Sequence, residues 1–251
     1  PTRRSSDLGL FDGLFIADIT GVYDVYQNNI DLTLRESIQL PSHDPTTLVS
    51  AMAAVTQHLG FGVTVNLSYE TPYQFARRFA SLDHLTQGRI GWNIVTGYLD
   101  SAQRLIGQSA LKDHDLRYDQ AEEFLALCYK YWEGSWESDA LLKDKQHRVF
   151  TDPHKVHSIH HSGRFYQSEG VFQVAPSVQR TPVLFQAGAS SRGMAFATAH
   201  AECIFIGGDQ PDKIKQNVDK IRERAKQHGR HPDDIKIFVG ITVVTAETTA
   251  E

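Results

Sequence analysis

Residues 181–193 read TPVLFQAGASSRG, and this stretch decides the fold class because an apolar run leads directly into a small, hydroxyl-rich turn. We expect a strand that ends near Gln186, a turn through Gly188 and a helix that begins at Ser191. Backbone amides and hydroxyl groups at the start of a helix favour an anion, so Ser190 is a candidate phosphate ligand. The same residues also fit an ordinary strand-to-helix turn in which a serine is the N-cap.

The same order of strand and helix repeats along the chain. We expect strands at 11–18, 61–69, 89–95, 183–187, 202–206 and 235–242, and helices at 44–59, 72–85, 117–132, 191–200 and 211–228. Such alternation indicates repeated βα units and a parallel sheet. An eight-stranded barrel of about 250 residues has more strands than this chain offers. We therefore expect an α/β fold, a (β/α)8 TIM barrel that is incomplete at both ends.

The alternation breaks at residues 133–178, where glycine and proline separate short pieces. We interpret this stretch as an insertion within a partial barrel domain that spans residues 9–251. Long excursions of this kind usually shape or cover a site, so we expect it over or beside the site end of the sheet.

Composition narrows the class of protein. The chain has 251 residues, of which 41% are hydrophobic, and its net charge of −5 gives no overall attraction to nucleic acid or to an anionic membrane. We expect neither as a partner. Cys128 and Cys203 lie far apart, which favours buried free thiols in a reducing compartment. No apolar stretch approaches membrane length and no signal region follows the start, so we expect a cytoplasmic protein.

Polar residues occupy the carboxyl ends of the first three expected strands, where parallel βα barrels carry their working residues. Asp18 ends the first strand, Thr64 lies along the second and Asn93 lies near the end of the third. Asp18 alone fits a turn cap and Thr64 alone fits an ordinary strand residue. Together they predict one shared binding site. Its surroundings are aromatic in character, with candidate substrate-pocket residues Phe11, Phe15, Tyr69, Tyr73 and Tyr98.

His114 and Tyr118 are four residues apart at the start of an expected helix, so both could donate hydrogen bonds to one anion. The alternative is a helix start capped by Asp113 or Asp115, with His114 in solvent.

Other site chemistries find less support. The histidines at 154, 157, 160 and 161 lie near no cysteine and match no compact zinc spacing, so we expect no metal. The chain holds no Gly-x-Ser-x-Gly nucleophile motif and no Gly-Lys-Ser/Thr phosphate loop.

Taken together, several segments resemble the luciferase-like flavin monooxygenases of the nitrilotriacetate and dibenzothiophene-sulfone monooxygenase family. The segments are FDGLFIAD (11–18), AAVTQHLG (53–60), ARRFASLDHL (76–85), GRIGWNIVT (88–96), HDLRY (114–118), DPHKVH (152–157) and QAGAS (186–190). Within the family, VTGYLDSA (95–102) and YWEGSWE (131–137) look most similar to dimethyl sulfide monooxygenase.

The resemblance implies that FMN is bound by Asp18, Thr64, His114, Tyr118 and Ser190, with Asn93 near its ring. It also implies a barrel of the bacterial luciferase type, reduced FMN from a separate NAD(P)H-dependent flavin reductase, and O2 as co-substrate. The substrate would be a small organosulfur compound such as dimethyl sulfide. Which residues are catalytic stays open.

Two rival functions remain. One is a related oxygenase for an amine chelator, an alkane or a larger sulfone, and the other is a noncatalytic flavin or coenzyme-binding protein on the same barrel. We also expect residues 1–8 to be a non-native or disordered leader, because they depart from the family pattern, and a full-length parent to form a homo-oligomer.

Overall fold

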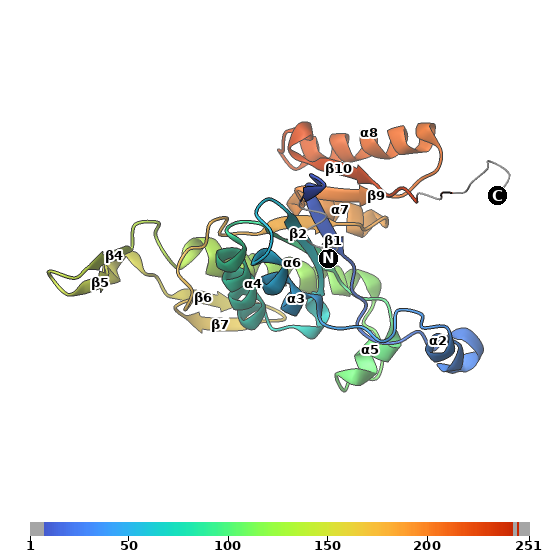
Figure 1. The fold of residues 1–251 in the computed structure, drawn as a ribbon, viewed down its shortest axis with the longest axis horizontal. Helices are drawn as coiled ribbons and strands as arrows, with labels where there is room; N and C mark the ends of the chain where they lie inside the picture. Colours follow the sequence, from blue (N-terminus) through green and yellow to red (C-terminus); the bar gives the residue numbers. More distant parts are fainter. Residues whose placement is uncertain (1–7, 243–244, 246–251) are drawn as a thin grey trace. The chain divides into compact units, whose positions relative to one another are not determined.

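The computed structural model describes residues 8–242 and residue 245 (Figure 1). The chain divides into two compact units, with the boundary between Leu184 and Phe185. Apart from Leu8, the expected leader at 1–8 lies outside the described residues, as does the end of the chain at 246–251.

Three parallel strands form the centre of the first unit. They are β1 (Gly13–Ile16), β2 (Gly60–Asn66) and β3 (Ile90–Val95), in the order β1-β2-β3. Ile16 is level with Val63, and Thr64 is level with Asn93. The predicted parallel arrangement is therefore confirmed, although β1 is shorter than the predicted 11–18.

The main helices of this unit follow their strands in the predicted order, although α3 ends six residues before the predicted 59. They are α3 (Pro45–Ala53), α4 (Pro72–Thr86) and α6 (His114–Tyr129), and α6 continues into a π-helical turn, η3 (Lys130–Gly134). The sequence sets these starts: Asp44 caps α3 by accepting from the Thr46 amide at 2.8 Å, and Asp113 caps α6 by accepting from the Asp115 amide at 3.1 Å. Because of that cap, α6 begins three residues before the predicted 117.

An aromatic cluster joins β3 to the helices α4 and α6. The Phe75 ring lies 4.2 Å from the Trp92 ring, 4.4 Å from Phe79 and 5.4 Å from Phe124, measured between ring centroids. All four side chains are fully buried. Burial of each contributes roughly 1.5–3 kcal/mol, so this cluster holds the helices to the sheet.

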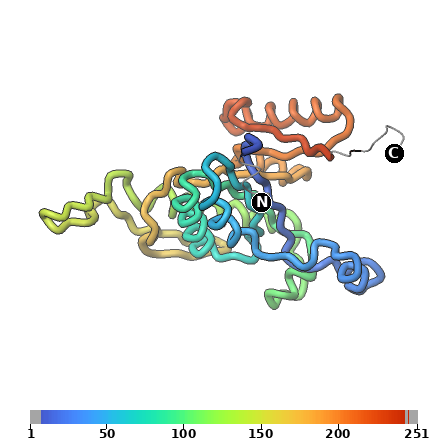
Figure 2. The backbone as a smooth tube through the Cα atoms, viewed as in Figure 1, coloured from blue at the N-terminus to red at the C-terminus, as the bar shows by residue number. Residues whose placement is uncertain are grey.

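The chain between β1 and α3 makes a long excursion that the sequence patterns did not predict (Figure 2). It carries η1 (Tyr26–Asn28) and α2 (Asp31–Arg35), and a further short helix, α5 (Asp100–Leu105), follows β3. The Ser101 hydroxyl donates to the Val22 carbonyl at 2.7 Å and accepts from the Val22 amide at 3.1 Å. Arg104 also pairs with Asp24, so the excursion is attached to the loop region after β3.

The predicted insertion folds into two antiparallel hairpins. One joins β4 (Leu141–Asp144) to β5 (Val149–Thr151), and the other joins β6 (Ile159–Ser162) to β7 (Gln167–Gly170), with a 3-10 turn η4 (Pro153–Lys155) between them. The β4–β5 hairpin extends away from α4 and α6 (Figure 1).

The position of the insertion differs from the prediction. Glu123 in the middle of α6 accepts hydrogen bonds from the Tyr166 amide at 2.8 Å and the Phe165 amide at 3.0 Å. At the end of the insertion, Gln179 donates to the carbonyl of Ile90, the first residue of β3, at 2.8 Å. Most of the insertion therefore lies along the helices and toward the amino end of β3. These contacts do not confirm the expectation that the insertion lies over or beside the carboxyl ends, because they join residues far apart in the sequence that no local pattern indicates.

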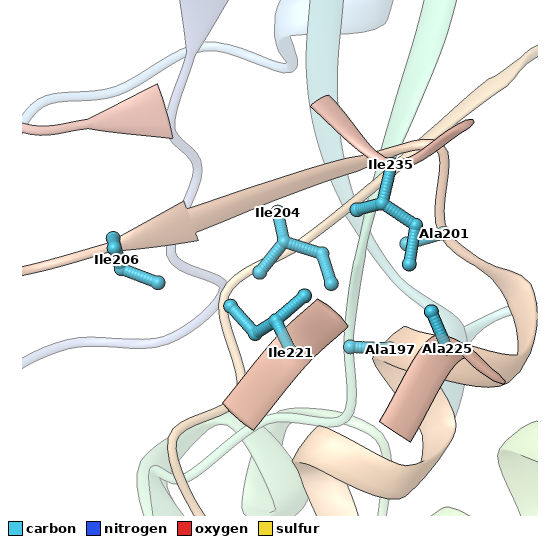
Figure 3. Close-up of a cluster of buried hydrophobic side chains, with 7 residues drawn as sticks. All are labelled: Ala197, Ala201, Ile204, Ile206, Ile221, Ala225 and Ile235. Atoms are coloured by element: carbon cyan, nitrogen blue, oxygen red, sulfur yellow. The ribbon is translucent and has the colours of Figure 1, made fainter. Parts of the chain in front are cut away.

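The second unit is a smaller βα arrangement. Its parallel strands are β8 (Val183–Gln186), whose first two residues belong to the first unit, β9 (Cys203–Ile206) and β10 (Lys236–Val239). Between them lie α7 (Ser191–His200), α8 (Pro211–Gln227) and a 3-10 turn η5 (Pro232–Asp234). Figure 3 shows its core, where Ala197 of α7, Ala201 just after that helix, and Ile221 and Ala225 of α8 pack with Ile204, Ile206 and Ile235. The strand and helix bounds agree with the prediction to within three residues.

Candidate functional site

Thr64 and Asn93 form a buried polar pair on adjacent strands. The Asn93 side-chain amide donates to the Thr64 hydroxyl at 2.9 Å, and the two residues are 4% and 5% exposed. Within the described part of the chain, the other amide atom, Asn93 Oδ1, is buried and has no hydrogen-bond partner. An unsatisfied buried acceptor costs about 1–3 kcal/mol. This pair therefore offers an acceptor suited to an N–H or O–H group of a ligand.

Asp18 lies two residues beyond the end of β1, toward the same end of the sheet as the pair, as predicted. Partial burial raises its pKa, and the negative charge of Asp44 raises it further, while the Ile19 backbone amide donates to it and lowers it. The ionised form of Asp18 is therefore destabilised in the folded chain, and a hydrogen-bond donor on a ligand would stabilise it.

Tyr69 follows β2 at this end, in the 3-10 turn η2 (Leu67–Tyr69). Its buried hydroxyl meets no partner with hydrogen-bond geometry among the described residues, although the Gln103 and Asn66 side chains lie close enough to lower its pKa. Burial outweighs them and raises the pKa. Asn66 and Tyr69 can lie this close to the backbone at residue 97 because that residue is glycine. Its φ is +79°, and a Cβ there would lie 2.6 Å from Asn66 Nδ2 and 2.9 Å from the Tyr69 hydroxyl.

Tyr98 lies in the loop after β3, and its hydroxyl is hydrogen-bonded to that of Tyr23 from the long excursion. Desolvation, together with the Tyr23 hydroxyl, raises the pKa of Tyr98 to about 12. The Tyr98 residue is 59% exposed. Tyr23 was not predicted as a site residue, because no pattern in the excursion indicated which residues return to β3.

His114 and Tyr118 share one face of the first turns of α6, as the spacing predicted. Their ring centroids are 5.2 Å apart. The His114 side chain is 46% exposed and its Nδ1 lies 2.7 Å from an Asp115 carboxylate oxygen, whereas Tyr118 is buried. Asp113 caps the helix, so part of the alternative interpretation also holds: the helix start has its own cap and does not depend on a ligand.

Ser190 lies in the second unit, as the N-cap of α7. Its hydroxyl oxygen accepts from the Gly193 amide at 2.9 Å and its carbonyl accepts from the Met194 amide at 2.8 Å. Ser190 and Ser191 are exposed, and no acidic residue lies in the first turn of α7. Both predicted interpretations are compatible with this geometry, since a serine that caps the helix through its oxygen keeps its O–H proton for an anion.

Other predicted pocket residues lie elsewhere. Phe11 precedes β1, at the opposite end of that strand from Asp18, and is 65% exposed. The Tyr73 ring packs 5.5 Å from Tyr131 and 6.1 Å from Phe172 of the insertion. Phe15 lies within β1 and is partly exposed. Of the five aromatic candidates, only Tyr69 and Tyr98 follow strands at the carboxyl end, because the type of residue alone does not say which end of a strand it occupies.

Three of the four clustered histidines have side chains in contact with acidic residues of the first unit. His157 Nε2 lies 2.9 Å from Glu137, His161 Nε2 lies 3.1 Å from Glu123, and His160 Nδ1 lies 3.8 Å from Glu169. Over residues 8–242 and 245, no three histidine, cysteine or carboxylate side chains gather in a way that could hold a metal ion. In the same residues, no helix is long and apolar enough to cross a membrane. Both cysteines are free and buried, as predicted.

Known proteins resemble this chain in both sequence and fold. It is 52% identical over 243 residues to the long-chain alkane monooxygenase of Geobacillus thermodenitrificans (strain NG80-2), covering 97% of this chain and 55% of that protein. It is 50% identical over 240 residues to the dimethyl-sulfide monooxygenase of Hyphomicrobium sulfonivorans, covering 96% of this chain and 50% of that protein. The chain thus spans about half the length of the curated relatives it matches.

A solved structure extends the comparison to the fold. The crystal structure of riboflavin lyase with modified FMN and riboflavin superposes with a TM-score of 0.94 at 43% identity, covering 99% of this chain and 56% of that one. The family of luciferase-like monooxygenases matches residues 8–251. Since this match includes all the described strands and helices, the chain belongs to the luciferase-like monooxygenase family.

Proposed function

We propose that the protein to which this chain belongs is the oxygenase of a two-component system, which uses reduced FMN and O2 to oxygenate a small organic substrate. The observation that carries the proposal is the buried acceptor Asn93 Oδ1 beside Thr64 at the carboxyl ends of β2 and β3. A flavin ring carries N–H groups along one edge, and a buried acceptor without a partner fits such a donor. The bound reduced flavin would supply the electrons that activate O2.

The side chains of this unit have distinct proposed roles. Asn93 and Thr64 hold the polar edge of the ring, and Asp18 accepts a further hydrogen bond from the cofactor. His114 and Tyr118 bind its phosphate or ribityl chain, because the start of α6 presents both side chains on one face. None of these roles moves a proton in the oxygen transfer itself. They position the cofactor and keep water from it.

The turn at Ser190 is proposed as a phosphate ligand on the evidence of the second unit alone. The exposed hydroxyls of Ser190 and Ser191 precede a ten-residue helix whose first turn has no acidic residue. That combination favours an anion.

The proposed substrate is a small organosulfur compound such as dimethyl sulfide, with Tyr69 and Tyr98 at the pocket wall. An alkane is the nearest alternative, since the two relatives described above are almost equally similar. The proposal extends to a separate NAD(P)H-dependent flavin reductase, to a complete eight-stranded barrel in a homo-oligomer, and to the cytoplasm, which two free buried thiols favour.

The test supplies the chain with chemically or enzymatically reduced FMN, then with O2 and one candidate substrate at a time. Dimethyl sulfide, medium and long alkanes, dibenzothiophene sulfone and nitrilotriacetate form the panel, and products are identified by mass spectrometry with ¹⁸O2. Incorporation of one ¹⁸O atom into a substrate is expected. The control is the Asn93→Leu variant, which should yield less product at limiting flavin.

The rival function is that of a noncatalytic flavin-binding protein. Such a protein would bind reduced FMN with the same dependence on Asn93 and yet give no ¹⁸O-labelled product with any member of the panel. The binding and product measurements together therefore separate the two functions.

A further inference from the structure

A second polar pocket lies between η2, α5 and α6. Its lining residues are Ser68, Gln103, Ile106, Gln108, Lys112, Arg117 and Gln120, around about 310 Å³ of empty space that is open to solvent. Six of these seven residues carry hydrogen-bonding side chains and two are cationic. None is among the residues proposed to hold the flavin.

Arg117 is the unusual member of this pocket. Arg117 is 8% exposed. Within the described part of the chain, one terminal nitrogen of its guanidinium donates to the Lys112 carbonyl. Its Nε is buried without a partner in the same part of the chain. A guanidinium has five N–H donors, so most of its donor capacity is unused.

The charge of Arg117 is also unpaired. Among residues 8–242 and 245, no carboxylate lies within ion-pair distance of Arg117 or Lys112, and none lines the pocket. Lys112 Nζ donates to the neutral Gln120 side chain at 2.8 Å. A buried cation is costly unless an anion accompanies it, and Arg117 acts on its surroundings: its charge lowers the pKa of nearby Tyr69 against the larger effect of burial.

Buried amides complete the pocket. Gln103 is 4% exposed and Gln120 is 9% exposed, and the Ser68 hydroxyl donates to the Thr96 carbonyl at 3.0 Å. Amide N–H groups beside two cations can donate to the oxygens of a carboxylate or phosphate without adding negative charge, whereas the Ser68 proton is already used.

We propose that this pocket is an oxyanion-binding site, in which Arg117 and Lys112 hold a carboxylate or phosphate group of a small ligand. Arg117 supplies the paired donors of a fork, and Lys112, on the exposed side, admits and releases the anion. The residues that line this site are not among those proposed to hold FMN, and the proposal does not depend on the proposed function.

The experiment measures binding of inorganic phosphate and, separately, of acetate by calorimetry, with total ionic strength held constant by sodium chloride. Wild-type chain should bind at least one of them, and the stronger of the two identifies the preferred group. The Lys112→Gln variant should bind it several-fold more weakly, and Arg117→Gln at least about tenfold more weakly. Circular dichroism establishes that each variant is folded.

Lys145→Gln is the matched control, because Lys145 is also exposed but lies in the loop of the β4–β5 hairpin. It should bind the anion like wild type. Since Lys112 is exposed, its variant keeps the test decisive even if Arg117→Gln does not fold. The proposal is overturned if wild type binds neither anion, or if Lys112→Gln binds as tightly as Lys145→Gln. A parallel loss of FMN affinity in Lys112→Gln would assign the pocket to the phosphate of the cofactor and would overturn the separate site.

Discussion

The strand ends at Thr64 and Asn93 and the turn at Ser190 both present polar groups where a parallel strand ends, but they do so in opposite ways. Thr64 and Asn93 are almost fully buried and leave one acceptor without a partner in the described chain. Ser190 is exposed, and its oxygen is already used to cap α7. The first arrangement costs stability unless a ligand is present, whereas the second contributes to stability without one.

The comparison shows that a buried polar atom without a partner says more about function than a helix cap does. A cap at a helix start is expected in any βα unit, so Ser190 alone does not distinguish a binding site from an ordinary turn. A buried amide oxygen that lacks a partner among the described residues is not expected in any unit, so Asn93 does distinguish a binding site. The two places should therefore respond differently. Loss of the Asn93 amide should lower flavin affinity with little change in stability, whereas loss of the Ser190 hydroxyl should lower stability and weaken flavin binding only modestly.

The largest effect is expected for Asn93→Leu. Loss of the buried acceptor should weaken FMN binding by about 2 kcal/mol, or roughly 30-fold, while the free energy of unfolding should change little, because removal of the unsatisfied oxygen offsets loss of the hydrogen bond to Thr64. Flavin fluorescence quenching and urea unfolding measure the two quantities. Gln179→Leu is the matched control, because the Gln179 amide donates to Ile90 at the amino end of β3, away from Asn93. This variant should lose stability and keep its FMN affinity. Equal losses of affinity in both variants would contradict the role of Asn93.

A somewhat smaller effect is expected for Ala189→Asp in the turn before α7. Its carboxylate should repel the phosphate of FMN and weaken binding by about tenfold, or about 1.4 kcal/mol. Ala189→Lys at the same position should strengthen binding or leave it unchanged, and added salt should reduce both effects. Ser190→Ala should weaken FMN binding modestly and cost about 1 kcal/mol of stability through loss of the cap. The same FMN dissociation constant in the aspartate and lysine variants would remove the phosphate from this turn.

His114→Ala tests the start of α6. Loss of one hydrogen bond should raise the FMN dissociation constant several-fold, and turnover at saturating reduced flavin should stay within about tenfold of wild type. His147→Ala is a suitable control, since His147 forms a similar exposed pair with Asp144 in the β4–β5 hairpin, with 2.7 Å between Nδ1 and the carboxylate oxygen. A collapse of turnover in His114→Ala with FMN affinity unchanged would make His114 a catalytic residue instead.

The smallest effect is expected for Asp18→Asn. Because the folded chain raises the pKa of Asp18, its ionised form is disfavoured, and this cost is present at neutral pH and fades as the pH falls through the folded and then the unfolded pKa. The variant should gain roughly 0.5 kcal/mol or less at neutral pH, no gain at acidic pH, and lose FMN affinity. Urea unfolding at both pH values checks the sign. A loss of stability at neutral pH would contradict it.

Local signals in the sequence were enough to place most strands and helices and to assign the fold class. The caps at Asp44 and Asp113, the apolar runs of β2, β3 and β9 and the period of α7 and α8 are local signals, so the strands and most of the long helices could be placed within a few residues. Parallel pairing follows from the lengths of the connections. Asp18, Thr64 and Asn93 were found for the same reason: each lies at or near the end of a predicted parallel strand, and such ends share one side of a sheet.

The hydrogen-bond partner of each polar group follows only from the tertiary structure. No local pattern indicates that Ser101 bonds Val22 at a separation of 79 residues, that Tyr23 reaches Tyr98, or that Glu123 anchors the insertion along α6. Nor does the sequence separate Phe11 from Tyr69, or distinguish a satisfied guanidinium from that of Arg117, whose Nε has no partner among the described residues. Burial and hydrogen-bond satisfaction depend on residues distant in the chain, and these two quantities separate a binding group from a structural one.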